Sequence, residues 1–519
     1  MNTALKYGVV IVTLLFGTPI FAQKNSNPKS EEDMLASFGK QGTFVLKGKA
    51  KNLKDKFFEF GMTTYLHNNE SYFVDFNKDG SFEKSFPIIN SQQLYLYLND
   101  DAVTITVADG DTILLNWDEK NFEKSFTLKS NNAGRTTTLE TEWEIYKNFR
   151  KPETELRDQF YKERETLSAK AKFDLLNNLY SKKVKFILSK DVDHANSSTS
   201  YLLSNNYFSY ASWLRDAKLL DRFSLKVVED SAFKLPMLEG KVNGKPSKSL
   251  KYGILDGSDN YKTSNERYLI ELPEYRDFMF NYIRFASPVN RYVEEIRKSS
   301  PTNFSFKDYY MAKAALRSTF VEDWFITNCL MFGFDYYPFK DVEEVYNHYL
   351  PQAKTPYFKK VLAEKYDLAK NLKPGLQAPN FSLPDDKGKS VSLSDFKGKV
   401  VYIDFWGVGC GPCIYDIENY EAKLHEGYKD KDVVFINICV DSGEKAWKNA
   451  IKEYKLTGIN LIAEGWTKNP VCKTYGVSGI PHYVIINKDG TMANNNAPRM
   501  YELSEATGKN ELDTALIKN

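Results

Sequence analysis

The stretch at residues 405–416, FWGVGCGPCIYD, holds two cysteines, Cys410 and Cys413, with Gly-Pro between them. An apolar run at residues 400–405 leads into it, which is typical of a buried strand, and the residues after the first cysteine are predicted to begin a helix. Two cysteines at such a junction indicate one of four things: metal ligands, a haem attachment, a structural bridge or a redox pair.

Three of these four explanations conflict with the surrounding residues. A c-type haem attachment needs histidine directly after the second cysteine, and Ile414 stands there. A structural zinc site needs further ligands, but Cys439 and Cys472 lie singly in predicted regular elements and are expected to be buried free thiols. A bridge that closes so short a loop constrains the unfolded chain little. The pair is therefore interpreted as a dithiol that alternates with a disulfide.

The two cysteines are expected to differ in reactivity. Unpaired N–H groups and the positive end of the peptide dipole stabilise an anion at a helix N-terminus, so Cys410 is predicted to be the nucleophilic thiolate. Cys413 lies one turn further into the helix and is predicted to resolve the mixed disulfide. Between them, Gly411 keeps the approach open and Pro412 restricts the geometry.

The first residues of the chain predict export. Lys6 precedes an apolar run at residues 8–21, and small Ala22 follows, which is the layout of a signal peptide at residues 1–22. The run is shorter than the ~18 apolar residues that usually span a bilayer. After cleavage near Ala22, the mature chain is expected to lack a membrane span and to lie in the periplasm or cell envelope.

Composition excludes some functions. The net charge of +2 comes from 70 basic and 68 acidic residues, so the chain lacks the basic excess of a nucleic-acid-binding protein. Five cysteines among 519 residues do not make a disulfide-stapled scaffold. With no convincing ligand set, neither a metal nor an organic cofactor is expected.

Residue composition and spacing divide the mature chain into three parts after a polar leader at residues 23–39. Short β-branched and aromatic runs separated by turn residues predict an antiparallel β-sandwich-like module at 40–128. Apolar and charged residues at helical spacing predict a mainly α-helical region at 129–371. Strand and helix patterns alternate at 375–519, which predicts an α/β domain with a mainly parallel sheet. The expected fold is therefore multidomain.

The C-terminal part resembles the exported TlpA/ResA-like thiol–disulfide oxidoreductases, in the redoxin (AhpC-TSA) group of the thioredoxin superfamily. The resemblance covers about 375–517 and rests on a G-x-x-A-P-x-F-x-L lead-in from Gly375 and a W-x-x-x-C-x-x-C signature from Trp406. Pro481 stands at the place of the family's cis-proline, and its long interval from Cys410 fits the extra β/α unit of this branch. The β module and helical stretch are similar to the N-terminal extension of some exported members.

The resemblance also implies roles for individual residues. Ile480 and Pro481 would lie beside the disulfide and pair with the substrate backbone. Asp404 matches the buried acid of thioredoxin, which is thought to accept the proton of the resolving cysteine. Asp416 stands where the ResA branch often carries glutamate, and its shorter side chain puts that group's role in doubt. Gly409 replaces a frequent tryptophan, which would leave the site more open.

The expected activity is reduction of disulfides in exported proteins, with electrons from a membrane thiol–disulfide donor, as the resemblance implies. Gly-Pro between the cysteines and Ile480 match reducing thioredoxins more than oxidising relatives. An oxidase or isomerase, a thiol peroxidase and a binding protein with a vestigial redox domain stay as alternatives. A peroxiredoxin-type site is disfavoured, because Trp406 occupies the position where that family normally carries threonine.

Overall fold

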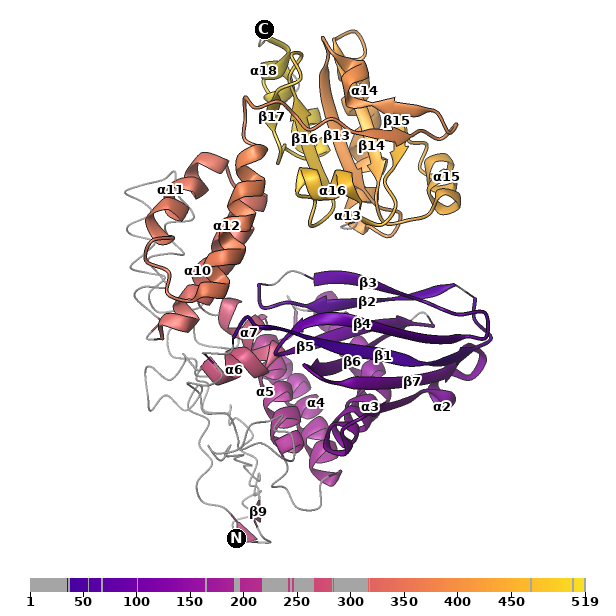
Figure 1. The fold of residues 1–519 in the computed structure, drawn as a ribbon, viewed down its shortest axis with the longest axis vertical. Helices are drawn as coiled ribbons and strands as arrows, with labels where there is room; N and C mark the ends of the chain where they lie inside the picture. Colours follow the sequence, from indigo (N-terminus) through magenta and orange to yellow (C-terminus); the bar gives the residue numbers. More distant parts are fainter. Residues whose placement is uncertain are drawn as a thin grey trace. The chain divides into compact units, whose positions relative to one another are not determined.

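The computed structural model describes residues 35, 38–54, 56–66, 69–99, 101–163, 166–190, 197–216, 241–242, 245–246, 266–281, 283, 316, 318–466, 469–505 and 508–517. The predicted signal peptide and nearly all of the polar leader lie outside these residues. The chain forms two compact units, Met1–Ile326 with Lys354–Tyr357, and Thr327–Ala353 with Phe358–Asn519. The narrower boundaries drawn from the sequence stay predictions. Figure 1 labels the elements of both units.

The N-terminal β module consists of two four-stranded sheets, in the orders β4-β1-β7-β8 and β3-β2-β5-β6. Its strands are β1 (Gln41–Lys51), β2 (Phe57–Thr63), β3 (Asn69–Asp75), β4 (Ser81–Ile89), β5 (Ser91–Leu98), β6 (Asp101–Ala108), β7 (Thr112–Asp118) and β8 (Thr127–Ser130). Neighbouring strands pair antiparallel, with the exception of the parallel pair β1 and β7. Aromatic and aliphatic side chains, Phe44, Phe60 and Trp117 among them, fill a shared core. The expected antiparallel module is confirmed, with this one parallel pair added.

Helices follow the sheets along the chain, as the sequence predicts. The described helices of the first unit include the one-turn η1 (Glu119–Asn121) and α2 (Phe122–Ser125), then α3 (Ala133–Glu163), α4 (Ala169–Ser189), α5 (Ser197–Asp216), α6 (Glu266–Glu271) and α7 (Pro273–Asn281). The short strands β9 (Lys241–Val242) and β10 (Lys245–Pro246) pair with each other. Leu139 and Trp143 of α3 belong to the core of the β module, so this helix covers the sheets directly. Residues 284–315 of the predicted helical region lie outside the described residues.

Three further helices connect the two units along the chain. Helix α10 (Thr319–Tyr336) begins in the first unit and ends in the second, and α11 (Phe339–Tyr349) and α12 (Pro356–Asn371) follow it. Within the part of the chain that the structure describes, no helix combines the length and apolar character that crossing a bilayer requires.

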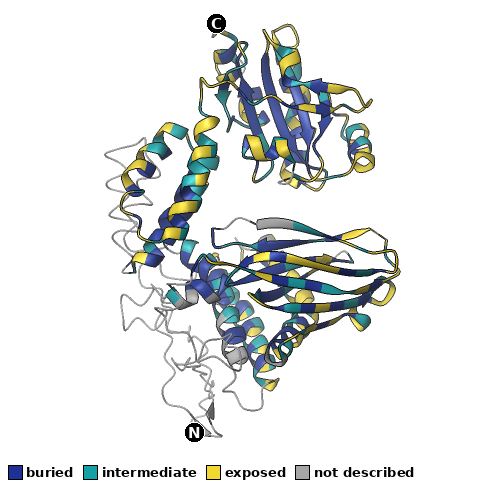
Figure 2. Ribbon diagram, in the orientation of Figure 1, coloured by how far each residue is buried: buried dark blue, intermediate teal, exposed yellow. Residues whose placement is uncertain are grey.

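The second unit is built on a five-stranded sheet in the order β15-β14-β13-β16-β17. Its strands are β13 (Val400–Trp406), β14 (Val433–Cys439), β15 (Ile459–Ile462), β16 (His482–Ile486) and β17 (Met492–Asn494). The first three run parallel, and β16 and β17 are antiparallel to their neighbours. Every residue of β13 is buried, because separate apolar cores cover the two faces of the sheet (Figure 2). This arrangement confirms the predicted α/β fold.

Shorter elements complete this unit. They are the hairpin β11 (Ser382–Pro384) and β12 (Ser390–Ser392), then η3 (Leu393–Phe396), α13 (Gly411–Asp416), the π-helical turn η4 (Ile417–Glu421), α14 (Ala422–Tyr428), α15 (Glu444–Glu453), α16 (Pro470–Tyr475), α17 (Met500–Glu505) and α18 (Glu511–Ile517). The cysteine pair lies where the central strand β13 gives way to α13, at the carboxyl end of the parallel strands. Open α/β sheets generally place their functional groups at this edge.

Candidate active site

Cys410 and Cys413 are joined by a disulfide at the start of α13. Cys410 is the N-cap residue of this helix, and its Sγ accepts a hydrogen bond from the backbone N–H of Cys413 at 3.1 Å. Cys413 is completely buried, whereas Cys410 keeps 9% of its surface exposed. Gly411 and Pro412 between them are exposed. An incoming thiolate or disulfide can therefore reach Cys410 but not Cys413, in keeping with the predicted division of roles.

The loop before Pro481 lies directly against the loop before Cys410. The Ile480–Pro481 peptide bond is cis. A Cβ atom built on Gly407 would lie 2.7 Å from Cδ1 of Ile480, so the two loops meet at this glycine. Trp406 is fully buried in the same apolar core as both cysteines. The structure thus brings the predicted site residues from distant parts of the sequence together.

Asp404 is buried in β13, with 1% of its surface exposed. Neither of its carboxyl oxygens has a hydrogen-bond partner among the described residues. Burial raises the pKa of this carboxyl well above its ordinary value, and the charges of Glu421 and Asp416 raise it further. A carboxyl group with a raised pKa holds its proton more tightly than a free carboxyl group does, and its carboxylate form is a stronger base.

Asp416 is completely buried and fully hydrogen-bonded. Arg499 donates from Nε to Oδ2 at 2.8 Å and from Nη2 to Oδ1 at 2.9 Å, and the Tyr483 hydroxyl donates to Oδ2 at 2.8 Å. Nη2 of Arg499 also lies 3.3 Å from the carbonyl oxygen of Pro412, between the two cysteines. The bonds to Asp416 raise the pKa of the guanidinium. This geometry favours a positioning role for Asp416, because its oxygens are already occupied.

Asp441, which the sequence reasoning missed, holds the loop that leads into Cys410. Its Oδ1 accepts the backbone N–H of Val408 at 2.8 Å, and its Oδ2 accepts that of Gly409 at 2.9 Å. A Cβ atom on Gly407 would come within 2.3 Å of Oδ2, so the carboxylate can approach only because residue 407 is glycine. A negative charge is thereby fixed next to the nucleophilic cysteine.

Glu421 is a third buried acid near the site, and no local sequence pattern points to it. It is 2% exposed and accepts a hydrogen bond from Nδ2 of Asn437 at 2.9 Å. Burial raises its pKa to about 7. Its charge is one of those that raise the pKa of Asp404, so the two acids are electrostatically linked.

The other cysteines of the domain, Cys439 and Cys472, are buried free thiols, as expected from the sequence. Burial raises the pKa of each to about 12, so neither ionises near neutral pH. Within the described part of the chain, no group of three or more His, Cys, Asp or Glu side chains could hold a metal ion.

A disulfide on the first turn of a helix, next to a cis-proline loop and above a mixed sheet, defines a thioredoxin-like thiol–disulfide exchange domain. Residues 373–512 match the family model described as Redoxin. The C-terminal part of this chain is therefore similar to the Redoxin family, and the relatives that it matches support its predicted TlpA/ResA-like character.

Two curated relatives illustrate the match. The thiol-disulfide oxidoreductase ResA of Bacillus thuringiensis subsp. konkukian is 40% identical over 116 residues, which are 22% of this chain and 65% of the relative. ResA of Bacillus subtilis is 36% identical over 116 residues, or 22% of this chain and 63% of the relative. This chain thus spans slightly less than two thirds of the length of these relatives.

A solved structure is also similar to this part of the chain. It is the thioredoxin domain of a thiol-disulfide oxidoreductase from Bacteroides vulgatus, 33% identical in sequence, with a TM-score of 0.24. The match covers 26% of this chain and 94% of that one.

Proposed function

We propose that this protein is a thiol–disulfide oxidoreductase that exchanges electrons with the disulfides of other proteins. One observation carries the proposal: a disulfide at the N-terminus of α13 in which Cys410 keeps part of its surface exposed while Cys413 is completely buried. The ResA relatives, which are named for this activity, support it.

In the reducing direction, the Cys410 thiolate attacks one sulfur of a client disulfide and forms a mixed disulfide. The displaced client sulfur leaves as a thiolate and takes a proton. Cys413 then loses its proton and attacks the Cys410 sulfur, which releases the second client thiolate and closes the Cys410–Cys413 disulfide. Two electrons pass from the protein to the client, and an external dithiol must restore them.

Asp404 is assigned the proton transfer in the second step. The Cys413 thiol must become a thiolate inside an apolar environment, where a charged sulfur is costly. In its deprotonated form, a carboxyl group with a raised pKa is a stronger base than an ordinary carboxylate, and it can take up that proton. Ile480 and Pro481 are assigned to pairing with the client backbone, and Trp406 to packing beneath the disulfide.

The direction of electron flow, the compartment and the electron donor belong to the same proposal. We assign a reductase of exported proteins, fed by a membrane thiol–disulfide donor. The predicted signal peptide and the ResA relatives support this assignment. An oxidase or isomerase would use the same residues, so the equilibrium potential of the cysteine pair decides between them.

The test is a redox titration of the mature protein, with thiol trapping across defined dithiothreitol or glutathione buffers. A potential near the ~−270 mV of thioredoxin supports the reductase. A potential near or above the ~−180 mV of protein disulfide isomerase contradicts it and supports oxidation or isomerisation of clients.

Replacement of single cysteines tests the division of roles. Cys410→Ala should lower disulfide exchange at least about 10³-fold, since no other accessible thiol can attack. Cys413→Ala should instead accumulate a mixed disulfide between client and Cys410, visible by non-reducing electrophoresis. The control Cys472→Ala, which removes a buried thiol of the same domain, should retain exchange. Exchange that survives in Cys410→Ala would contradict the proposed function.

A further inference from the structure

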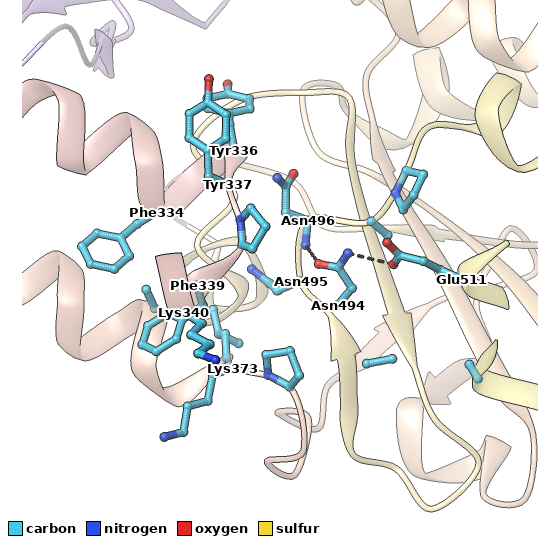
Figure 3. A pocket seen from close by; sticks show the side chains of 18 of the residues that line it. Phe334, Tyr336, Tyr337, Phe339, Lys340, Lys373, Asn494, Asn495, Asn496 and Glu511 are labelled. Atoms are coloured by element: carbon cyan, nitrogen blue, oxygen red, sulfur yellow. Dashed lines mark hydrogen bonds between the residues drawn. The ribbon is translucent and has the colours of Figure 1, made fainter. Parts of the chain in front are cut away.

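A cavity of about 1040 Å³ opens beside the redox domain, within the second unit (Figure 3). Aromatic rings between the end of α10 and the start of α11 line one side of it, and three consecutive asparagines that begin with the last residue of β17 line the other. The rings belong to Phe334, Tyr336, Tyr337 and Phe339, and the amides belong to Asn494, Asn495 and Asn496. The cavity thus places apolar rings opposite groups that donate and accept hydrogen bonds.

One wall of the cavity reaches the cis-proline loop. The Tyr336 hydroxyl lies 3.7 Å from the position that a Cβ atom on Gly479 would take, and Gly479 directly precedes Ile480. The neighbouring Asp335 accepts a hydrogen bond from the Ser478 hydroxyl at 3.4 Å. The end of α10 therefore lies against the loop to which the proposed function assigns the client backbone.

The opposite wall reaches the cysteine turn. Arg499 lines the cavity and also donates to the carbonyl oxygen of Pro412 at 3.3 Å. The same cavity is therefore bordered by residues that touch both loops of the redox site.

We propose that this cavity binds an extended polypeptide segment of the client next to the cysteine under exchange; the inference rests on the proposed function. A peptide offers alternating N–H and C=O groups, and an asparagine amide can bond to both. The Asn496 side-chain amide makes no hydrogen bond to another described residue, and Oδ1 of Asn495 has no partner among them. Tyr336, which is 53% exposed, offers apolar area to one client side chain.

The charges of the cavity fit a polypeptide better than a simple anion. Lys340, Lys373 and Arg499 line it together with Glu343, Glu502 and Glu511, so neither sign dominates. A phosphorylated or sulfated ligand would be expected to meet a cationic lining. The mixed lining suits a client chain that carries few charges close to its cysteine.

The experiment compares two disulfides of different size, with dithiothreitol as the electron source. The large substrate is a peptide of about twelve residues whose single cysteine is disulfide-bonded to 2-mercaptoethanol, and the small one is 2-hydroxyethyl disulfide. Tyr336→Ala should raise the KM for the peptide about tenfold, with kcat within about twofold of the wild type. Its rate with the small disulfide and its redox potential should not change.

Controls separate this inference from the proposed function. Tyr97→Ala removes a tyrosine of similar exposure (49%) in the β module and should leave both substrates unaffected. An unchanged peptide KM in Tyr336→Ala, or an equal loss with the small disulfide, would overturn the cavity proposal while the exchange activity stands. A wild-type protein that reduces neither substrate would instead overturn the proposed function.

Discussion

Each unit encloses a carboxyl group, but the hydrogen bonds made by that group differ between the two units. In the first unit, Glu142 of α3 accepts hydrogen bonds from the backbone N–H and the hydroxyl of Thr106, at 3.1 and 2.8 Å. Burial raises its pKa to about 7, and the positive charge of Arg135 opposes the shift. In the second unit, Asp404 has no hydrogen-bond partner among the described residues, and it is more deeply buried than the half-buried Glu142.

This contrast separates structural from functional use of a buried acid. A carboxyl group bonded like Glu142 joins a helix to a sheet, and its bonds offset part of the cost of burial. An acid left without partners destabilises the fold, and proteins generally retain such groups where chemistry uses them. The β module is accordingly interpreted as a packing or docking module, and the redox domain as the reactive part.

The largest expected effect concerns Asp416, a buried acid of the redox domain that does have partners. Arg499→Ala would leave this carboxylate with only Tyr483 and should cost about 3 kcal/mol of unfolding free energy. Lys431→Ala breaks a more exposed ion pair to Asp513 and should cost less than about 1 kcal/mol. Urea titration measures both. Equal losses of unfolding free energy in the two variants would contradict a larger contribution from the ion pair of the buried Asp416.

The next prediction tests the contrast between Asp404 and Glu142. Because the pKa of Asp404 is raised, the folded state keeps a proton that the unfolded state loses above about pH 4, so stability falls as pH rises. Asp404→Asn removes this loss, so it should raise the free energy of unfolding at pH 7 and change it little at pH 4. It should also slow exchange about tenfold, since the proton acceptor is gone.

Glu142→Gln is the matched variant in the first unit. Stability should change by less than about 1 kcal/mol, because the amide oxygen can still accept the Thr106 N–H while the amide NH2 can donate to the Thr106 hydroxyl oxygen. Thermal unfolding from pH 4 to pH 8 measures how the stability of both variants, Asp404→Asn and Glu142→Gln, depends on pH. If Asp404→Asn destabilises the protein at pH 7, the distinction between a structural and a functional acid fails.

The smallest expected effect is an electrostatic change in the redox potential of the cysteine pair. Asp441→Asn removes a negative charge next to Cys410, which stabilises the thiolate and should raise the redox potential by roughly 15–30 mV. Asp385→Asn is the control, since Asp385 also accepts two loop N–H groups, from Lys387 and Lys389, but in the β11–β12 hairpin. Thiol trapping measures both potentials. A shift of the same size in the control would contradict a local effect.

The parts of the site that were predictable are those with a signal close by in the sequence. The cysteine pair, its strand and its helix lie within one short segment, and Pro481 follows from a family motif. Arg499 and Asp441 act through contacts between residues far apart in the sequence, which local patterns do not reveal. One signal was available: Asp441 lies just past β14, and Gly407 lies just past β13, the parallel strand beside it. Adjacent parallel strands end at the same edge of a sheet.

Prediction of the β module from the sequence has a similar limit. Runs of β-branched and aromatic residues mark most of its strands, but charged residues and Pro87 interrupt the pattern of β4 (Ser81–Ile89). The structure explains the exception: β4 is the end strand of its sheet, where a proline without an N–H is tolerated. A strand with one free edge carries a weaker apolar pattern than a central one.

The glycines of the redox loops differ in how well they would tolerate a side chain. A side chain at Gly407 would displace Asp441 and Ile480 together, and moving the carboxylate would break its bonds to the loop. At Gly411, by contrast, a Cβ atom would meet nothing within 4 Å. A library of variants should therefore retain glycine at 407 and accept many residues at 411. Evolution can thus alter the dipeptide between the cysteines, and with it the redox potential, without rebuilding the loop that holds them.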